Sequence, residues 1–339
     1  MKDSKMDSLD AKWVRTALLH HTLGGVEREG GWSPQRFTER QLDVYAAQEA
    51  QGKRSRCSAG VVMKLRTDAE RLKLSVVFQG AARDYAAFDL YVNGRGIVSE
   101  GIESFEGQSA VRVELSFAIP LLPGERGKRN ALRIVFPQNV ETLLLGVEVS
   151  AGAVVEPVAK HPRRLLSLGD SITQGMDGRH AAYSYPVQVA DFLEMDLLNQ
   201  GVGGYVFDPD SLDPALAEHY PADLITVAYG TNDWNRGYER REFESIVSNY
   251  LDKLISIYPN VPIYVITPIW RRVAEEQRSL GNLHDVAAII AAVAARCAQV
   301  KVIDGYGLVP GDERVFADGT HPNDEGYTHY ALQLLKALR

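Results

Sequence analysis

The stretch Ser167-Leu168-Gly169-Asp170-Ser171-Ile172-Thr173-Gln174-Gly175 decides how the second half of this chain is interpreted. It contains the end of a short apolar run, Arg164 to Leu168, that is typical of a buried strand. Ser171 then stands between a strand end and a helix start, where its hydroxyl is exposed and the field of a helix N-terminus favours a nucleophile. The competing interpretation makes Ser171 only a helix N-cap, and the local sequence does not decide between the two.

Outward from this stretch, apolar runs without alternation are separated by segments with helical periodicity. Further strands are predicted at Asp196–Asn199, Leu224–Tyr229, Pro262–Thr267 and Val300–Ile303, and helices near 185–195, 240–257, 282–298 and 325–338. Strands that alternate with helices predict an α/β fold, in which helices cover both faces of a five-stranded parallel sheet. The chemistry of such folds lies in the loops beyond the carboxyl ends of the strands.

The first half of the chain has a different pattern. Apolar residues alternate with other residues in 72–78, 111–119 and 143–149, as in half-buried antiparallel strands. Turn signals such as Asn93-Gly94 and Pro123-Gly124 separate these segments. The pattern predicts an all-β, jelly-roll-like sandwich, with one or two strands plus loops in the first 50 residues.

The change of pattern gives the domain boundaries. We predict an accessory β-sandwich domain over residues 1–160 and a catalytic α/β domain over residues 161–339. The stretch Glu156 to Pro162 is the predicted linker.

Composition excludes several classes of function. The chain has 339 residues, 45% of them hydrophobic, and a net charge of −7 without a basic stripe, so we expect no nucleic-acid partner. The apolar run Val286–Ala295 is about half of the ~20 residues that a membrane span needs, so no membrane partner is expected. The N-terminus has no signal-peptide pattern, and Cys57 and Cys297 are too few for a disulfide framework; both observations predict a cytoplasmic protein.

Two further loops follow predicted strands. Asn199-Gln200-Gly201-Val202-Gly203-Gly204 has closely spaced glycines, which let a backbone approach a ligand. A dinucleotide-binding turn would need glycine at position 206, which is Val206; a tight structural turn remains the alternative. In Gly230-Thr231-Asn232-Asp233, the Asn232 side chain could donate a hydrogen bond to a tetrahedral oxyanion, although Asn and Asp are also common in turns.

The fourth loop, Asp318-Gly319-Thr320-His321-Pro322, precedes the last predicted helix. A carboxylate three residues before a histidine can hold the tautomer whose other nitrogen takes a proton from serine. A surface turn and a metal site formed by Asp318, His321 and Asp324 are the alternatives. No second histidine or cysteine motif accompanies these residues, so no metal and no cofactor are expected.

Taken together and in this order, the four loops resemble the motifs of the SGNH, or GDSL-type, hydrolase superfamily over about residues 163–338. The resemblance implies a three-layer, flavodoxin-like domain with Ser171 as nucleophile, His321 as general base and acid, and Asp318 as the residue that orients His321. It also implies an oxyanion hole formed by the backbone N–H groups of Ser171 and Gly204 and by the side-chain amide of Asn232.

The first half has a weaker resemblance to the β-sandwich that precedes the hydrolase domain in a larger bacterial subgroup of that superfamily. Ser58-Ala59-Gly60 and Phe88-Asp89-Leu90-Tyr91-Val92 carry it, although Ala87 or Phe88 stands where that subgroup's signature has glycine. Carbohydrate esterases with a jelly roll before an SGNH domain have a similar plan, which makes an acetylated sugar an expected substrate.

These observations predict a cofactor-free serine esterase acting on a small-molecule or carbohydrate ester. An acyltransferase with the same residues and a non-catalytic carbohydrate-binding protein are the alternatives; the acyl group, the alcohol and the oligomeric state are not predicted. The N-terminal domain is expected to contribute no catalytic group. Aromatic residues just beyond strand ends are candidates for substrate contact or for core packing: Tyr205, Phe207, Trp234 and Trp270.

Overall fold

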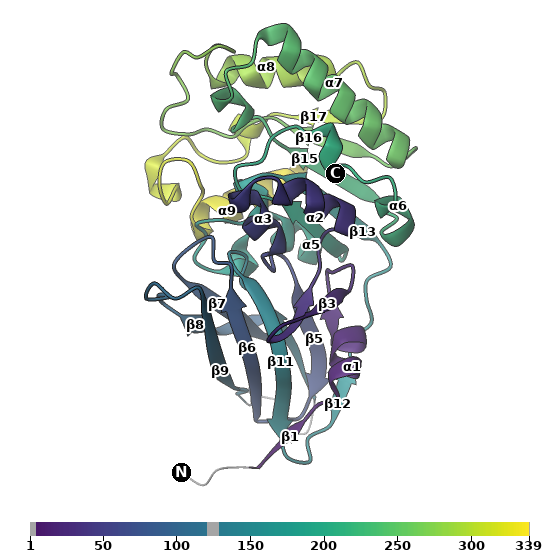
Figure 1. The fold of residues 1–339 in the computed structure, drawn as a ribbon, viewed down its shortest axis with the longest axis vertical. Helices are drawn as coiled ribbons and strands as arrows, with labels where there is room; N and C mark the ends of the chain where they lie inside the picture. Colours follow the sequence, from purple (N-terminus) through teal and green to yellow (C-terminus); the bar gives the residue numbers. More distant parts are fainter. Residues whose placement is uncertain (1–4, 121–128, 339) are drawn as a thin grey trace. The chain divides into compact units, whose positions relative to one another are not determined.

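A computed structural model describes residues 5–120 and 129–338 (Figure 1). It forms two compact units. The first unit contains the residues through Arg36, residues 56–160 and residues 180–182, and the second contains residues 37–55, 161–179 and those from Tyr183 onward. The predicted boundary at residue 160 stays a prediction, and the units depart from it at 37–55 and 180–182. The turn predicted at Pro123-Gly124 lies outside the described residues.

The first unit is a sandwich of two antiparallel sheets. In the described part of the chain one sheet has the order β3-β4-β11-β6-β9, with β1 paired to β11, and the other has the order β12-β5-β10-β7-β8, with β2 paired to β5. The bounds are β1 Met6–Ser8, β2 Leu19–His20, β3 Gly25–Arg28, β4 Gly31–Pro34, β5 Val62–Thr67, β6 Arg71–Gln79, β7 Ala86–Val92, β8 Arg95–Ile102, β9 Ala110–Ala118, β10 Asn130–Val135, β11 Glu141–Ser150 and β12 Val155–Pro157; a short helix α1, Ala11–Trp13, runs on into a π-helical turn over Val14–Leu18.

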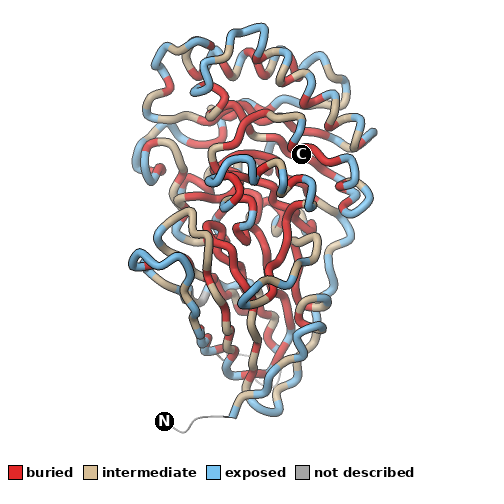
Figure 2. Tube along the Cα trace, in the orientation of Figure 1, coloured by how far each residue is buried: buried red, intermediate tan, exposed pale blue. Residues whose placement is uncertain are grey.

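Alternation along the strands builds the core of this sandwich. In β6, Leu72, Leu74, Val76 and Phe78 are buried, and the residues between them are partly exposed. Phe78 packs against Phe88 of the other sheet, with ring centroids 5.9 Å apart. Figure 2 shows buried positions recurring along these strands. The predicted β-sandwich is therefore confirmed.

Two predictions about connections in this half have different outcomes. Asn93 and Gly94 join β7 to β8 with φ values of 50° and 77°, which is the conformation of a tight hairpin turn, as predicted. The first 50 residues hold more than the predicted strands and loops. They contain helix α2, Glu39–Ala46, and the start of α3, Glu49–Arg56. Thr38 begins α2 with a capping box to Gln41, a short-range signal that the alternation analysis does not detect.

The second unit contains the parallel sheet, in the order β14-β13-β15-β16-β17. Its strands are β13 Arg164–Gly169, β14 Asp196–Gly201, β15 Leu224–Ala228, β16 Ile263–Ile266 and β17 Val300–Ile303. All five strands lie where the sequence predicted them, and the order, second-first-third-fourth-fifth along the chain, is flavodoxin-like. The strand that follows β13 in the chain, β14, lies on one side of it, and the next strand, β15, lies on the other side. The loops after β13, β14 and β15 therefore meet at one edge of the sheet.

Helices cover both faces of this sheet. They are α4 Ser171–Gln174, α5 Tyr185–Phe192, α6 Leu216–His219, α7 Arg240–Ile257, α8 Leu283–Ala294 and α9 Asp324–Ala337. Helix α5 packs on α9 and α7 packs on α8, and Figure 1 shows the two pairs on opposite sides of the strands. The predicted three-layer α/β fold is confirmed.

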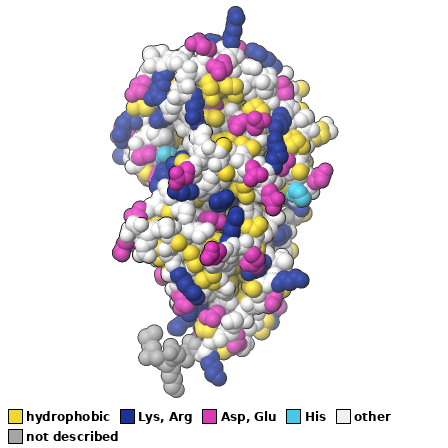
Figure 3. All heavy atoms as spheres, viewed as in Figure 1, with side chains coloured by type: hydrophobic (Ala, Val, Ile, Leu, Met, Phe, Trp, Pro, Cys, Tyr) yellow, Lys and Arg dark blue, Asp and Glu magenta, His cyan; other side chains and the backbone are white. Residues whose placement is uncertain are grey.

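Two properties of the surface and the helices complete the description. Acidic and basic side chains are intermixed on the face shown in Figure 3. Within the described ranges, no helix combines the length and the hydropathy needed to cross a membrane.

Candidate active site

Ser171 is the first residue of α4, directly after β13. The N-cap of this helix is Asp170, whose Oδ1 accepts a hydrogen bond from the N–H of Ile172 at 2.9 Å. The capping role that competed for Ser171 is thus filled by its neighbour. Ser171 lies at the positive end of a short helix. Only 8% of its surface is exposed, so the residue is buried rather than exposed as the sequence predicts.

Glycine lets the second loop approach this helix closely. A Cβ atom on Gly201 would lie 2.2 Å from the backbone nitrogen of Gln174, so a larger residue does not fit there. Two side chains then fix the loop to α4. Asn199 Nδ2 donates to the carbonyl of Thr173 at 2.8 Å, and the N–H of Gly203 donates to Gln174 Oε1 at 2.9 Å. The glycine loop is therefore fixed against α4, the short helix that begins with Ser171.

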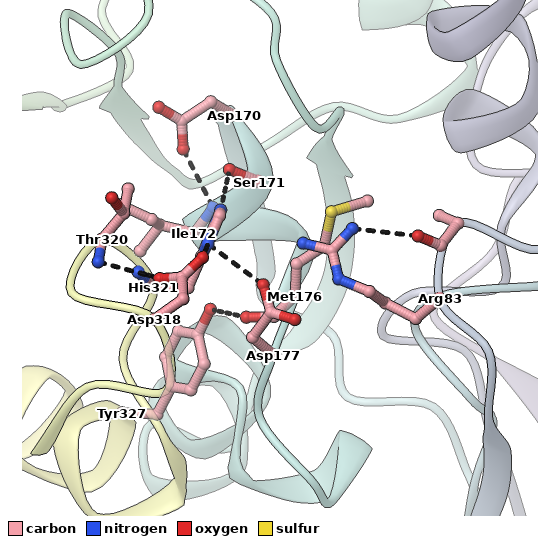
Figure 4. Close-up of polar contacts among 11 residues, drawn as sticks. Arg83, Asp170, Ser171, Ile172, Met176, Asp177, Asp318, Thr320, His321 and Tyr327 are labelled. Carbon is pink, nitrogen blue, oxygen red and sulfur yellow. Dashed lines mark hydrogen bonds and ion pairs between the residues drawn. The ribbon is translucent and has the colours of Figure 1, made fainter. Parts of the chain in front are cut away.

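The structure brings Ser171, His321 and Asp318 together (Figure 4). His321 Nε2 is 2.8 Å from Ser171 Oγ, and His321 Nδ1 is 2.8 Å from Asp318 Oδ2. The other carboxylate oxygen of Asp318 accepts the N–H groups of Thr320 and His321, both at 2.8 Å. This arrangement holds the imidazole so that Nδ1 carries the hydrogen and Nε2 can accept a proton from the serine.

A second carboxylate, Asp177, reaches the same ring nitrogen. Its Oδ2 lies 3.0 Å from His321 Nδ1. The backbone of Asp177 is in the left-handed region, with φ at 67°, and Tyr327 fixes the preceding residue by donating from its hydroxyl to the Met176 carbonyl at 2.7 Å. Sequence reasoning missed Asp177, because it lies two residues beyond the Gly175 that ends the first motif and carries no signal of its own.

Carboxyl groups around the serine have pKa values shifted in opposite directions. The hydrogen bond from His321 holds the pKa of Asp318 well below its usual range, so Asp318 is ionised at neutral pH. Burial raises the pKa of Asp170 to about 6 and that of Asp233 to about 7. Asp318 therefore carries a negative charge beside His321 Nδ1, where it stabilises an imidazolium.

The predicted oxyanion donors converge on the same edge of the sheet. Gly204 adopts a φ of 77° in the glycine loop. Asn232 Nδ2 donates to the Tyr205 carbonyl at 3.0 Å and to Asp170 Oδ2 at 3.3 Å. Within the described ranges, the N–H groups of Ser171 and Gly204 donate to no protein acceptor. Both N–H groups are thus available to an oxyanion, and the Asn232 amide is held next to them.

Helices α2 and α3 cover the glycine loop, although they come from the first 60 residues. Arg54 Nη1 donates to the Gly203 carbonyl at 2.9 Å, and a Cβ atom on Gly204 would lie 3.0 Å from the same nitrogen. Gln41 exchanges hydrogen bonds with Gln200 at 3.0 and 3.1 Å, and the Tyr45 ring packs edge-on against Tyr205. The sequence assigned these helices to the sandwich domain, whereas they pack on the second unit.

The candidate substrate-contacting aromatic residues are mostly packed inside. Trp234 is 1% exposed and its indole donates to the Gly281 carbonyl; Phe207 and Tyr205 are also buried. Only Trp270 among the four keeps partial exposure, packed against Phe316 with centroids 5.0 Å apart. Core packing, the alternative interpretation, therefore describes the structure better for the other three.

The metal site considered from the sequence is not assembled as such. In the described part of the chain, Asp177, Asp318 and His321 form the one group of three metal-ligand types whose donor atoms lie within 4.8 Å of one another. Asp324 is not a member of this group. His321 Nδ1 is hydrogen-bonded to carboxylate and its other nitrogen contacts Ser171 Oγ, which is the arrangement of a serine hydrolase.

Comparison with known families agrees with this geometry. Residues 167–329 match the GDSL-like Lipase/Acylhydrolase family. This part of the chain belongs to that family. The protein is therefore an enzyme of the GDSL type that acts on ester bonds. A comparison with curated proteins found no match.

Several solved structures share the fold of the GDSL-type chain. A salicylyl-acyltransferase, SsfX3, from a tetracycline biosynthetic pathway has a TM-score of 0.81 at 19% identity, covering 100% of this chain and 98% of that one. A putative GDSL-like lipase from Bacteroides ovatus has a TM-score of 0.74 at 16% identity, covering 98% and 97%. The acetyl xylan esterase Est2A from Butyrivibrio proteoclasticus has a TM-score of 0.64 at 14% identity, covering 99% and 98%.

Proposed function

We propose that the protein is a serine esterase that forms an acyl-enzyme on Ser171. The observation that carries the proposal is the continuous hydrogen-bonded chain from Ser171 Oγ through His321 to Asp318, at 2.8 Å for each link. The distance from Ser171 Oγ to His321 Nε2 permits proton transfer, and Asp318 lies within hydrogen-bond distance of the imidazole that it orients.

The first half of the reaction acylates the serine. Ser171 Oγ attacks the ester carbonyl carbon while its proton passes to His321 Nε2. The carbonyl oxygen becomes an oxyanion, which accepts from the N–H groups of Ser171 and Gly204 and from the Asn232 amide, whose N–H exchanges its longer hydrogen bond to Asp170 Oδ2, 3.3 Å, for one to the oxyanion. When this intermediate collapses, the carbon–oxygen bond to the alcohol breaks and His321 gives its proton to the leaving oxygen.

The second half frees the enzyme. A water molecule gives a proton to His321 Nε2 and attacks the acyl carbon, and the collapse of the second tetrahedral intermediate returns the proton to Ser171 Oγ. If an alcohol takes the place of water, the same steps transfer the acyl group. The fold shared with a salicylyl-acyltransferase favours this second candidate, and the fold shared with an acetyl xylan esterase supports hydrolysis of an acetylated carbohydrate.

Covalent labelling tests the acyl-enzyme directly. The protein is incubated with a fluorophosphonate, and the labelled peptide is identified by mass spectrometry, with p-nitrophenyl acetate hydrolysis measured in parallel. We expect one adduct, on Ser171, and loss of nearly all hydrolysis in Ser171→Ala. An adduct on another residue, or activity of Ser171→Ala within a few-fold of the unmodified protein, contradicts the proposal.

Product analysis separates hydrolysis from transfer. An acetylated xylo-oligosaccharide is the donor, and a second alcohol is added in increasing amounts. Release of acetate that the alcohol does not reduce supports the esterase, whereas acetylated acceptor formed at the expense of acetate supports the acyltransferase.

A further inference from the structure

Arg271 lies in the loop after β16, at the sheet edge where the catalytic loops meet. The next residue, Arg272, donates its backbone N–H to the carbonyl of Gly319 at 2.8 Å, and Gly319 stands between Asp318 and His321 in the chain. On the other side, the Arg271 guanidinium carbon lies 5.5 Å from the ring centroid of Trp234, two residues after Asn232. Arg271 is therefore placed between the loop of the oxyanion donor and the loop of the histidine.

The side chain of Arg271 makes no hydrogen bond and no ion pair with any residue that the structure describes. Its Nε is buried and lacks a partner. The arginines around it differ: Arg272 pairs with Glu313 at 2.7 Å, and Arg278 pairs with Glu276 at 2.9 Å while stacking on Trp234 at 3.9 Å. A guanidinium has five N–H donors, and a buried donor is normally hydrogen-bonded. The described residues thus supply no hydrogen-bond acceptor to the Arg271 guanidinium.

Charges near Arg271 leave room for an anion. Asp318 is already paired with His321, and Asp170 already accepts hydrogen bonds from the N–H of Ile172 and from Asn232 Nδ2. Neither carboxylate approaches Arg271 closely enough to form an ion pair in the described part of the chain. Arg271 keeps its charge at neutral pH, because an arginine remains protonated even when burial lowers its pKa.

We propose that Arg271 binds a carboxylate of the substrate, so that the preferred esters carry a free carboxylate near the scissile bond. The planar fork of a guanidinium matches a carboxylate with two parallel hydrogen bonds, one of which uses the buried Nε. The site lies on the same edge as Ser171, so the carboxylate anchors the ester whose carbonyl Ser171 attacks. This inference rests on the proposed esterase function and names the substrate class of the same site.

Matched ester pairs test this assignment. One pair is 3-acetoxybenzoate and its methyl ester, with the free carboxylate on the alcohol side. The other is the mono-4-nitrophenyl ester of adipic acid and its methyl ester, with the free carboxylate on the acyl side. The measured quantity is the ratio of kcat/KM for the free acid to that for the methyl ester, in the unmodified protein and in Arg271→Gln, Arg271→Lys and Arg272→Gln.

We expect the unmodified protein to prefer the free acid at least tenfold in one of the two pairs. Arg271→Gln removes that preference, Arg271→Lys keeps part of it, and Arg272→Gln, the matched control next to it in the chain, keeps it in full.

A ratio near one in both pairs for the unmodified protein overturns the inference without any variant. An unchanged ratio in Arg271→Gln overturns it as well, since a structural role beside Trp234 would lower both members equally. If Arg271→Gln does not fold, Arg271→Lys decides: an unchanged ratio there, together with an unchanged ratio in Arg272→Gln, refutes the carboxylate fork.

The two proposals fail separately in this experiment. If Ser171→Ala hydrolyses the esters like the unmodified protein, the acyl-enzyme proposal is wrong. If Ser171→Ala is inactive and neither pair shows a preference, the esterase proposal stands and only the role of Arg271 is refuted.

Discussion

The two carboxylates at His321 Nδ1 lead to a quantitative expectation for Asp318→Asn. In a triad with one carboxylate, the asparagine amide faces Nδ1 as a donor and selects the wrong tautomer, which costs about 10⁴ in kcat. Here Asp177 Oδ2 still accepts from Nδ1 at 3.0 Å, only 0.2 Å farther than the 2.8 Å of Asp318. The asparagine Oδ1 can still accept the two backbone N–H groups of its own loop, so the loop geometry is kept.

We therefore expect Asp318→Asn to lose about 10–10² in kcat, and Asp177→Asn less than about tenfold, because each leaves one acceptor that holds the tautomer. The double variant leaves none and falls by about 10⁴. The single losses multiply to at most about 10³, so the double-variant cycle gives a coupling of at least about 1.4 kcal/mol. Asparagine tolerates the left-handed backbone at position 177, which makes Asp177→Asn a conservative change.

The assay is p-nitrophenyl acetate hydrolysis with kcat and KM measured separately, and thermal unfolding checks that each variant folds. A tautomer effect appears in kcat and leaves KM nearly unchanged. The reasoning is refuted if Asp318→Asn alone loses about 10⁴ while Asp177→Asn matches the unmodified protein, since Asp177 would then not replace Asp318.

Three further expectations follow from the site. Asn232→Ala should lower kcat by about 10²–10³ with a much smaller change in KM, because it removes one oxyanion donor, and an effect confined to KM would place Asn232 on the ground-state substrate. The free energy of unfolding should decrease as pH rises from about 4 to about 7, since burial raises the pKa of Asp233 to about 7, so that the folded state holds that proton more tightly than the unfolded state. The slope, measured by urea titration at several pH values, should be smaller in Asp233→Asn, and an equal slope would contradict the assignment to Asp233. A chelator should leave hydrolysis unchanged, and activity that is lost in EDTA and restored by a divalent ion would revive a metal role for Asp177, Asp318 and His321.

The catalytic loops could be predicted because each signal is local. A strand of the parallel sheet is an unbroken apolar run, and its end is marked by the residue types that follow: serine, glycines, or asparagine. Parallel topology then places all these ends at one edge, so the sequence predicts the meeting of Ser171, Gly204 and Asn232 without any knowledge of distances. The Asp318–His321 pair is similarly local, because its members lie three positions apart in one loop.

Residues whose role depends on a distant partner could not be predicted. Asp177 becomes a neighbour of His321 only because the chain turns back after α4. Arg271 is notable only because none of the described residues forms a hydrogen bond or an ion pair with its side chain, which is a property of its surroundings. The sequence alone also left Trp234 as a candidate for substrate contact, since an aromatic residue beyond a strand end has the same pattern whether it is buried or exposed.

The sequence by itself determined the α/β class, the five strands, the antiparallel first half and the order of the four motifs, because hydrophobic periodicity and loop chemistry are written within a few residues. Only the tertiary structure decided that α2 and α3 pack on the glycine loop. Arg54 and Gln41 make these contacts with residues that are distant in the sequence. The physical reason is that these contacts join polar groups over 140 residues apart, and no short-range pattern encodes such a pairing.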